Sequence, residues 1–169
     1  GGGETLWSRQ FADAKGYAEG HAVSALGDAG VVVAGYSGTG RDVRVTELSA
    51  SGVLLRDTRF GSAGEDTVYG IATNSAGAIY VAGRTSGANF DGGQAQAGSE
   101  AFAVKLGADR TLGWITRFGG IGDNAAKAIA LDTEGAIYLA GDFAMNAMKE
   151  GEGFVRKIDA AGNTRWTTA

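Results

Sequence analysis

Ile137-Tyr138-Leu139-Ala140-Gly141 decides the fold of this chain, because a copy of this stretch occurs in each third of the sequence. The other copies are Val31-Val32-Val33-Ala34-Gly35 and Ile79-Tyr80-Val81-Ala82-Gly83. Their glycines lie 48 and then 58 residues apart. Self-similarity at a period of roughly fifty residues is typical of repeat architectures, in which each repeat is one supersecondary unit.

A second signature accompanies each copy and ends in phenylalanine. It reads Trp7-Ser8-Arg9-Gln10-Phe11, Arg56-Asp57-Thr58-Arg59-Phe60 and Trp114-Ile115-Thr116-Arg117-Phe118. Each repeat contains four short segments of β-branched, aromatic or alternating apolar residues, which glycine turns separate. These segments are centred in order on Val23, Ile71 and Ile129; on Val31, Ile79 and Ile137; on Val45, Val104 and Val155; and on Trp7, Trp114 and Trp166. The pattern predicts a four-stranded antiparallel meander in each repeat.

The second strand of each repeat is apolar on both faces, which predicts a sheet with a neighbouring sheet on each side. Four-stranded sheets packed in this way are the blades of a β-propeller. A β-sandwich has no reason to repeat at this period, and a β-solenoid normally has shorter coils. We therefore predict an all-β fold of propeller-type blades: three four-stranded antiparallel meanders plus one leading strand, in an open arc or as part of a larger or oligomeric ring.

The expected organisation is a single repeat domain over residues 1–169. A leading strand at 6–11 precedes blades at about 17–60, 66–118 and 124–169. Propeller rings close with about four to eight blades, so three are too few. Two copies could complete a ring, the chain could belong to a longer propeller, or the leading strand could pair with another subunit.

Composition excludes several classes of function. The chain has 169 residues, of which 44% are hydrophobic, and a formal net charge of -4. Its lysines and arginines do not cluster, so no nucleic-acid partner is expected. No apolar run approaches the ~20 residues of a membrane span, so no membrane insertion is expected. The absence of cysteine removes disulfides and thiolate metal sites. The single histidine, His21, has no nucleophile partner in the sequence, and no calcium loop motif occurs. We expect no catalytic residues, no cofactor and no metal.

The third repeat combines Trp-x-x-x-Phe-Gly-Gly-x-Gly-Asp, Ile-Ala-x-Asp-x-x-Gly-x-Ile-Tyr-x-Ala-Gly and Phe-Val-x-Lys-Ile-Asp-x-x-Gly-x-x-x-Trp over residues 114–166. This pattern resembles the bacterial SBBP-type β-propeller repeat, and the resemblance extends over residues 6–166. The second repeat departs from it at Arg56 and the first at residues 12–16. The resemblance implies a propeller fold and a secreted or cell-surface setting in bacteria. It implies no catalytic residues, because the family motif is structural.

Length variation between the repeats is concentrated in one connection, from the second to the third strand. In a meander this loop emerges at the same end as the connection to the next blade. Variable loops on a rigid scaffold are common binding sites. The candidate ligand-binding residues are Tyr36, Asn89, Phe90, Asp91 and Phe143. The tryptophans share one repeat column, so packing between blades is expected for them, with sugar stacking as the alternative.

The sequence therefore predicts a non-enzymatic scaffold or interaction module of a bacterial secreted, periplasmic or surface protein. Its expected partners are other copies of itself or neighbouring blades of a longer chain, together with a protein or glycan ligand. Two other hypotheses stay open at this point. One is a carbohydrate-binding propeller lectin, and the other is a fragment of a larger propeller enzyme.

Overall fold

The computed structural model describes residues 3–12, 17–87, 90, 98–144 and 151–169. These residues form three four-stranded antiparallel sheets, which we call the first, second and third blades. The first blade consists of β1 (Ala18–Ala25), β2 (Val31–Ser37), β3 (Asp42–Leu48) and β4 (Leu54–Phe60). The second consists of β5 (Asp66–Thr73), β6 (Ile79–Thr85), β7 (Gly98–Leu106) and β8 (Leu112–Phe118). The third consists of β10 (Ala125–Leu131), β11 (Ile137–Ala144), β12 (Gly151–Ile158) and β13 (Thr164–Thr168).

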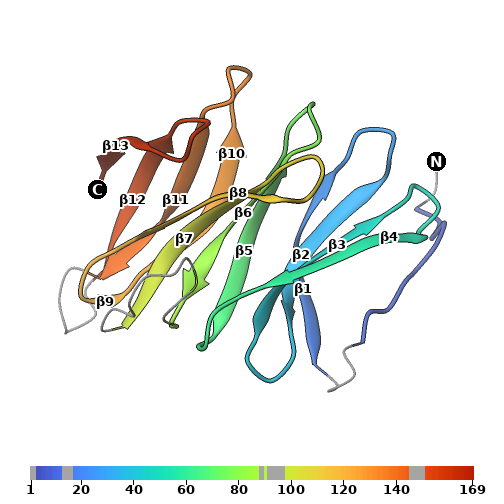
Figure 1. Ribbon diagram of the computed structural model, residues 1–169, viewed down its shortest axis with the longest axis horizontal. Helices are drawn as coiled ribbons and strands as arrows, with labels where there is room; N and C mark the ends of the chain where they lie inside the picture. The colour runs from blue at the N-terminus through green and yellow to red at the C-terminus, as the bar shows by residue number, and fades with distance from the viewer. Residues whose placement is uncertain (1–2, 13–16, 88–89, 91–97, 145–150) are drawn as a thin grey trace.

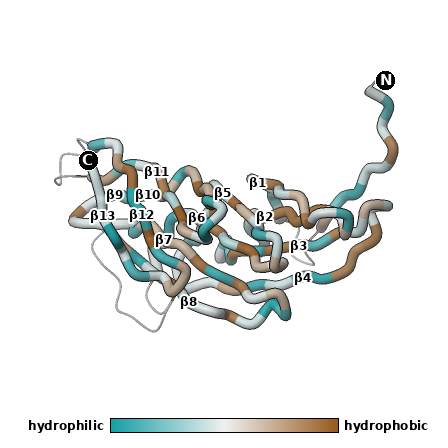
Figure 2. The backbone as a smooth tube through the Cα atoms, turned by 90° about the horizontal axis from the view of Figure 1, so that it is seen from above, coloured by the Kyte–Doolittle hydropathy of each residue, from teal (hydrophilic) through white to brown (hydrophobic). Residues whose placement is uncertain are grey.

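The three blades stand side by side in an open arc (Figure 1). Seen from above, β1, β5 and β10 follow one edge of the arc, and β4, β8 and β13 lie toward the other (Figure 2). The first strands of neighbouring blades, β1 with β5 and β5 with β10, contact each other, so they form the inner edge of the arc. A short strand, β9 (Gly122–Asp123), pairs in parallel with the start of β7 and joins the second blade to the third. The prediction of an all-β fold of propeller-type blades is confirmed.

Two hydrophobic clusters hold the blades together, one at each junction. The first cluster combines Val32, Ala34, Val43 and Val45 of the first blade with Val68, Ile79, Val81, Phe90, Phe102, Val104 and Leu106 of the second. The second combines Ala78, Tyr80, Ala82, Ala101, Ala103 and Phe118 of the second blade with Ala126, Ile137, Leu139, Phe154 and Ile158 of the third. The middle strands β6 and β7 of the second blade thus contribute buried residues from both faces, as the doubly apolar pattern of residues 79–83 predicts.

Strand pairing corrects one column of the sequence comparison. Ala34 of β2 pairs with Val45, Ala82 of β6 pairs with Ala103, and Ala140 of β11 pairs with Val155. The equivalent residue of the second blade is therefore Ala103, and Val104 lies on the opposite face. Because side chains alternate between the faces of a strand, a shift of one residue exchanges the two faces.

The glycine that ends each signature stretch is required by a close backbone approach. A Cβ atom at Gly35, Gly83 or Gly141 would overlap the carbonyl oxygen of a residue in the neighbouring first strand. At Gly83 that oxygen belongs to Thr67, and the ring of Phe102 also lies in the way. The repeated Ala-Gly pair is therefore the sequence signature of this inner strand contact.

The tryptophan column forms a repeated contact between blades. Trp114 of β8 reaches the turn between β12 and β13, where its Nε1 donates a hydrogen bond of 3.1 Å to the carbonyl oxygen of Ala160. Its ring lies over Gly162, where an added Cβ would collide with the indole. Gly162 has φ +89°, which also favours glycine. The expected packing of this tryptophan between blades is confirmed.

Residues 6–11, predicted as a leading strand, form no strand in the structure. A fourth strand pairs with the third strand of its own blade, and β3 of the first blade already pairs with β4. The segment is held by side chains instead. Trp7 Nε1 donates to the carbonyl oxygen of Ala50 at 2.9 Å, and the Trp7 ring lies over Gly52. Trp7 thus packs on the turn at residues 49–52 as Trp114 packs on the turn at residues 159–162. We call the surface of such a turn, with its carbonyl oxygen and its glycine, a seat.

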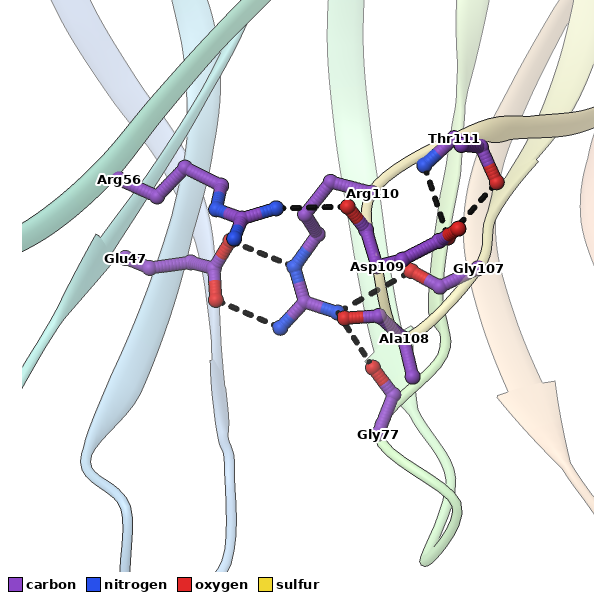
Figure 3. A network of polar contacts seen from close by, with 8 residues as sticks. All are labelled: Glu47, Arg56, Gly77, Gly107, Ala108, Asp109, Arg110 and Thr111. Atoms are coloured by element: carbon purple, nitrogen blue, oxygen red, sulfur yellow. Dashed lines mark hydrogen bonds and ion pairs between the residues drawn. The ribbon is translucent and has the colours of Figure 1, made fainter.

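The junction between the first and second blades uses different chemistry at the same positions (Figure 3). Arg56 replaces the tryptophan, and its Nη1 donates to the carbonyl oxygen of Asp109 at 2.6 Å. Arg110, with φ +71°, replaces the turn glycine. Its Nε and Nη2 each donate to one carboxylate oxygen of Glu47 at 2.5 Å. Its Nη1 also donates to the carbonyl oxygens of Gly77, Gly107 and Ala108.

The corner before β5 contains a buried carboxylate. Asp66 is 0% exposed and accepts hydrogen bonds from the Ser62 backbone N–H at 2.6 Å and from the Ser62 hydroxyl at 2.9 Å. Burial raises the pKa of Asp66 above its ordinary value, although hydrogen bonds from Thr85 and Ser62 oppose this shift. The folded protein therefore binds this proton more readily than the unfolded chain. Its stability falls as pH rises from the ordinary aspartate pKa through the raised one.

We expect Asp66→Asn to remove this loss of stability with rising pH, because an amide does not ionise. Asn124 occupies the equivalent corner of the third blade, so the site accommodates an amide. Urea unfolding of both proteins across the acid-to-neutral range measures the effect, with Glu134→Gln on an exposed turn as the control. A variant whose stability depends on pH as steeply as the wild type would contradict the role of Asp66.

Candidate binding face

The first strand of every blade contains a register shift near the variable-loop face, which is the end of the arc where β2–β3, β6–β7 and β11–β12 are connected. The shifts lie between Gly20 and Ala22, between Val68 and Gly70, and between Ala126 and Ala128. The residues inserted by these bulges are His21, Tyr69 and Lys127. Bulges redirect side chains and often occur beside functional sites.

Each inserted residue is accompanied by the residue that follows the glycine of the second strand. These following residues are Tyr36, Arg84 and Asp142. The rings of His21 and Tyr36 meet edge to face with centroids 5.2 Å apart. Lys127 Nζ forms an ion pair with Asp142 Oδ1. Tyr69 and Arg84 line one hollow. We call these three pairs, His21–Tyr36, Tyr69–Arg84 and Lys127–Asp142, the inner pairs.

The inner pair of the first blade belongs to a small polar cluster. Glu19 Oε2 lies 3.2 Å from His21 Nε2. The Tyr36 hydroxyl donates a hydrogen bond to Glu19, which raises the pKa of the tyrosine and lowers the pKa of the carboxyl group. The Arg41 guanidinium lies 5.1 Å from the centre of the Tyr36 ring. The first pair is thus anchored by charge and by ring contacts.

A polar hollow joins the inner pairs of the second and third blades. One part has a volume of about 360 Å³ and is lined by Glu65, Arg84, Ser86, Gly98, Ser99 and Asp123. A second part of about 150 Å³ shares Arg84, Ser99 and Asp123 and continues to Tyr69, Lys127 and Asp142. The hollow therefore presents a guanidinium, an ammonium group, carboxylates and a hydroxyl within one site.

Asn124 lines the second part of this hollow and holds the surrounding backbone in place. It is 0% exposed, and its Nδ2 donates to the carbonyl oxygens of Ser99, Gly120 and Gly122 at 2.9–3.0 Å. Its Oδ1 accepts from the backbone N–H of Ala144 at 3.2 Å. Ser99 in turn donates to Asp123 Oδ1 at 3.3 Å. One buried amide thus ties the connection between the blades to β7 and β11, which positions Ser99 and Asp123.

The groups around the hollow suit hydrogen bonding and charge recognition. Guanidinium groups bind carboxylates through paired hydrogen bonds, and carboxylate side chains accept hydrogen bonds from hydroxyls. Within the described residues, no group of three or more histidine, aspartate or glutamate side chains is close enough to hold a metal ion. The described part of the chain also contains no helix that is long and apolar enough to cross a membrane.

The structure separates the candidate residues that the sequence predicted. Tyr36 belongs to an inner pair, although its side chain is only 5% exposed. Phe143 lines another hollow, of about 380 Å³, together with Ile121 and Arg156. It also stacks on Phe154 with centroids 4.2 Å apart. Asn89 and Asp91 lie outside the described residues.

Phe90, predicted to contact a ligand, is instead a core residue. It is 5% exposed and belongs to the cluster between the first and second blades. Its ring centroid lies 4.6 Å from that of Phe102 and 6.1 Å from that of Phe60. A phenylalanine gains more by burial against such rings than by exposure to water, so Phe90 packs into the core.

Sequence reasoning missed Tyr69, Arg84, Lys127 and Asp123. A usable signal was nevertheless present in the sequence. The residue that follows each Ala-Gly pair differs completely in chemistry between the repeats, while the pair itself does not change. A position that varies beside fixed ones indicates a site that the fold leaves open. Bulges place Tyr69 and Lys127 beside this position, and the sequence pattern did not predict them.

The arc of three four-stranded sheets packed face to face defines a protein of the β-propeller class. A family model described as the SBBP beta-propeller repeat matches residues 58–91, which extend from β4 past β6. The resemblance to this repeat family, which the repeated sequence pattern indicates, is confirmed.

Among solved structures, the chain is similar to a mutant of apocarotenoid oxygenase from Synechocystis, with a TM-score of 0.49 and 16% sequence identity. The alignment covers 89% of this chain and 38% of the oxygenase chain. The chain therefore spans well under half of the length of that enzyme. No curated protein matches the sequence.

Proposed function

We propose that this chain is a propeller scaffold that binds a partner through the inner pairs and the polar hollow of its variable-loop face. One observation carries the proposal. The backbone repeats closely at three places, yet the side chains there are imidazole with phenol, phenol with guanidinium, and ammonium with carboxylate. A fixed scaffold that presents different groups at equivalent positions is suited to recognising an extended ligand that carries more than one kind of polar group.

The hollow offers partners for both carboxylate and hydroxyl groups of a ligand. Arg84 can bind a carboxylate, and Asp123 together with Ser99 can bind hydroxyls. Polysaccharides built from uronic acids carry both groups on each acidic sugar. The proposed role is therefore attachment to such a polymer by binding and not by catalysis. The SBBP-type repeat motif supports a bacterial secreted or cell-surface setting for this role.

Isothermal titration calorimetry with polygalacturonate tests this function. We expect Arg84→Gln to bind at least about tenfold more weakly than the wild type, because a charge-assisted hydrogen bond to a carboxylate contributes roughly 1.5–3 kcal/mol. Arg165→Gln removes a cation from the exposed strand β13 and serves as the matched control.

The control is expected to bind like the wild type. Circular dichroism of both variants shows whether the fold is retained. Equal binding by Arg84→Gln and the wild type would contradict the site, and a wild-type protein that binds no acidic polysaccharide would contradict the function.

A further inference from the structure

The face that each blade turns toward the next is buried in the first two blades. Its residues are Val32, Ala34, Val43 and Val45 in the first blade and Tyr80, Ala82, Ala101 and Ala103 in the second, all at most 2% exposed. In both cases the aliphatic and aromatic face of the following blade covers them. The chain thus contains two examples of how such a face is covered.

The equivalent face of the third blade is apolar but open. Val155, which corresponds to Val45 and Ala103, is 44% exposed. Next to it lies an apolar hollow of about 140 Å³, lined by Ala128, Ile129, Ala130, Tyr138, Leu139, Ala140 and Val155. Because the same columns are buried at the other two junctions, this face has the composition of a blade junction that lacks its second half.

Two donors complete a junction of this type in the second blade. Trp114 Nε1 and Lys105 Nζ both donate to the carbonyl oxygen of Ala160 in the turn of the third blade, at 3.1 and 3.5 Å. The two side chains are held over Tyr80, with ring centroids 6.2 Å apart for Trp114 and with Lys105 Nζ 5.8 Å from the Tyr80 centroid. Gly162 leaves room for the indole.

The third blade holds the same two donors in the same arrangement. The Trp166 ring lies 6.2 Å from that of Tyr138, and Lys157 Nζ lies 5.0 Å from the Tyr138 centroid. Trp166 is 43% exposed. Tyr138, Lys157 and Trp166 therefore form a preorganised binding site for a turn with a free carbonyl oxygen and a glycine. We call this site the latch.

Within the described residues, the turn at residues 49–52 is the one that both matches this latch and is occupied by a segment that could be displaced. It presents the carbonyl oxygen of Ala50 and the positive-φ Gly52, as the Ala160–Gly162 turn does for Trp114. In the turn of the second blade the Arg110 side chain occupies the corresponding place. Trp7 now occupies the 49–52 turn, but its segment has no backbone ladder to the first blade.

We propose that the third blade of one copy docks on the first blade of a second copy, with Trp166 entering the seat that Trp7 fills within a single chain. Residues 6–11 are then a displaceable cover of that seat. The receiving face includes Val33, Arg44 and Thr46 around a hollow of about 190 Å³. Its arginine suits a blade junction, because Arg156 lies in the existing junction with its guanidinium 3.9 Å from the centre of the Phe118 ring.

Size-exclusion chromatography with light scattering, over a series of concentrations, tests the docking. We expect Trp7→Ala to form assemblies of two or more copies where the wild type has the 17.1 kDa mass of one chain. An intramolecular segment competes at an effective concentration of roughly millimolar, so its release should lower the apparent Kd at least about tenfold. Adding Trp166→Ala should weaken this association by roughly thirtyfold, as for a hot-spot tryptophan.

Two further measurements keep the result specific. Val23→Ala, which shortens an exposed side chain on the inner strand β1, should leave the mass of the Trp7→Ala protein unchanged. A peptide of residues 4–12, added to the Trp7→Ala protein, should refill the seat and return the mass to one chain. The proposal is overturned if Trp7→Ala stays at the mass of one chain, or if its assemblies persist undiminished with Trp166→Ala or with the peptide.

Discussion

The Glu47→Ala variant is expected to lose about 3–5 kcal/mol of unfolding free energy, because it leaves a buried cation without its partner. The side chains of Arg110 and Glu47 are only 11% and 8% exposed, and both carboxylate oxygens are bound. The carboxylate raises the pKa of the Arg110 guanidinium. Without it the guanidinium still stays charged, because the ordinary pKa of arginine lies far above neutral pH. Urea unfolding followed by tryptophan fluorescence measures the loss.

The chain itself supplies a control for this junction. The triple variant Glu47→Lys, Arg56→Trp and Arg110→Gly installs the residue types of Lys105, Trp114 and Gly162, which form the next junction. Contacts within one network are not additive, so we expect the triple variant to recover most of the stability that Glu47→Ala loses. A loss of less than about 1 kcal/mol in Glu47→Ala would show that the ion pair lies at an effectively exposed position.

Gly83→Ala is expected to destabilise the protein by about 3 kcal/mol or more, at the upper end of overpacking effects, and to reduce the yield of folded protein. Its added Cβ would overlap the carbonyl oxygen of Thr67 and crowd the ring of Phe102. The backbone oxygen belongs to the strand ladder between β5 and β6, so it cannot move without breaking pairs. The central blade contacts both neighbours, and its distortion affects both hydrophobic clusters.

Gly153→Ala is the matched control for this prediction. Gly153 also lies in a strand, β12, but the nearest atom to its added Cβ is 3.9 Å away. Alanine loses less backbone entropy than glycine on folding, so this variant should be as stable as the wild type or slightly more stable. Thermal unfolding of both variants decides the point. Similar melting temperatures for Gly83→Ala and Gly153→Ala would contradict the steric explanation of the Ala-Gly column.

The sequence predicted the blades well because their signals are local or periodic. The apolar stretch at residues 79–83 and the turn glycines such as Gly162 encode strand and turn directly. The leading strand at 6–11 was wrong for a physical reason. Its sequence has the strand pattern, but a strand also needs a partner with free backbone groups, and β3 is already paired on both sides.

The candidate site was predicted less well. Tyr36, chosen as an aromatic residue close to a variable loop, lies in an inner pair, whereas Phe90 was assigned to a ligand and is part of the core. An aromatic residue in a long loop has the same appearance in sequence whether it faces solvent or folds inward. Tyr69 and Lys127 were missed because a bulge places them, and a bulge depends on how two strands pair.

The sequence by itself therefore determined the repeat, the four-strand pattern of each blade and the glycines that close contacts require. Tertiary structure alone decided which residues meet across blades. It set Glu47 against Arg110, placed Trp7 and Trp114 on their turns and left Trp166 exposed. The physical reason is that strand periodicity is a property of neighbouring residues, while these contacts join residues 43 to 63 positions apart.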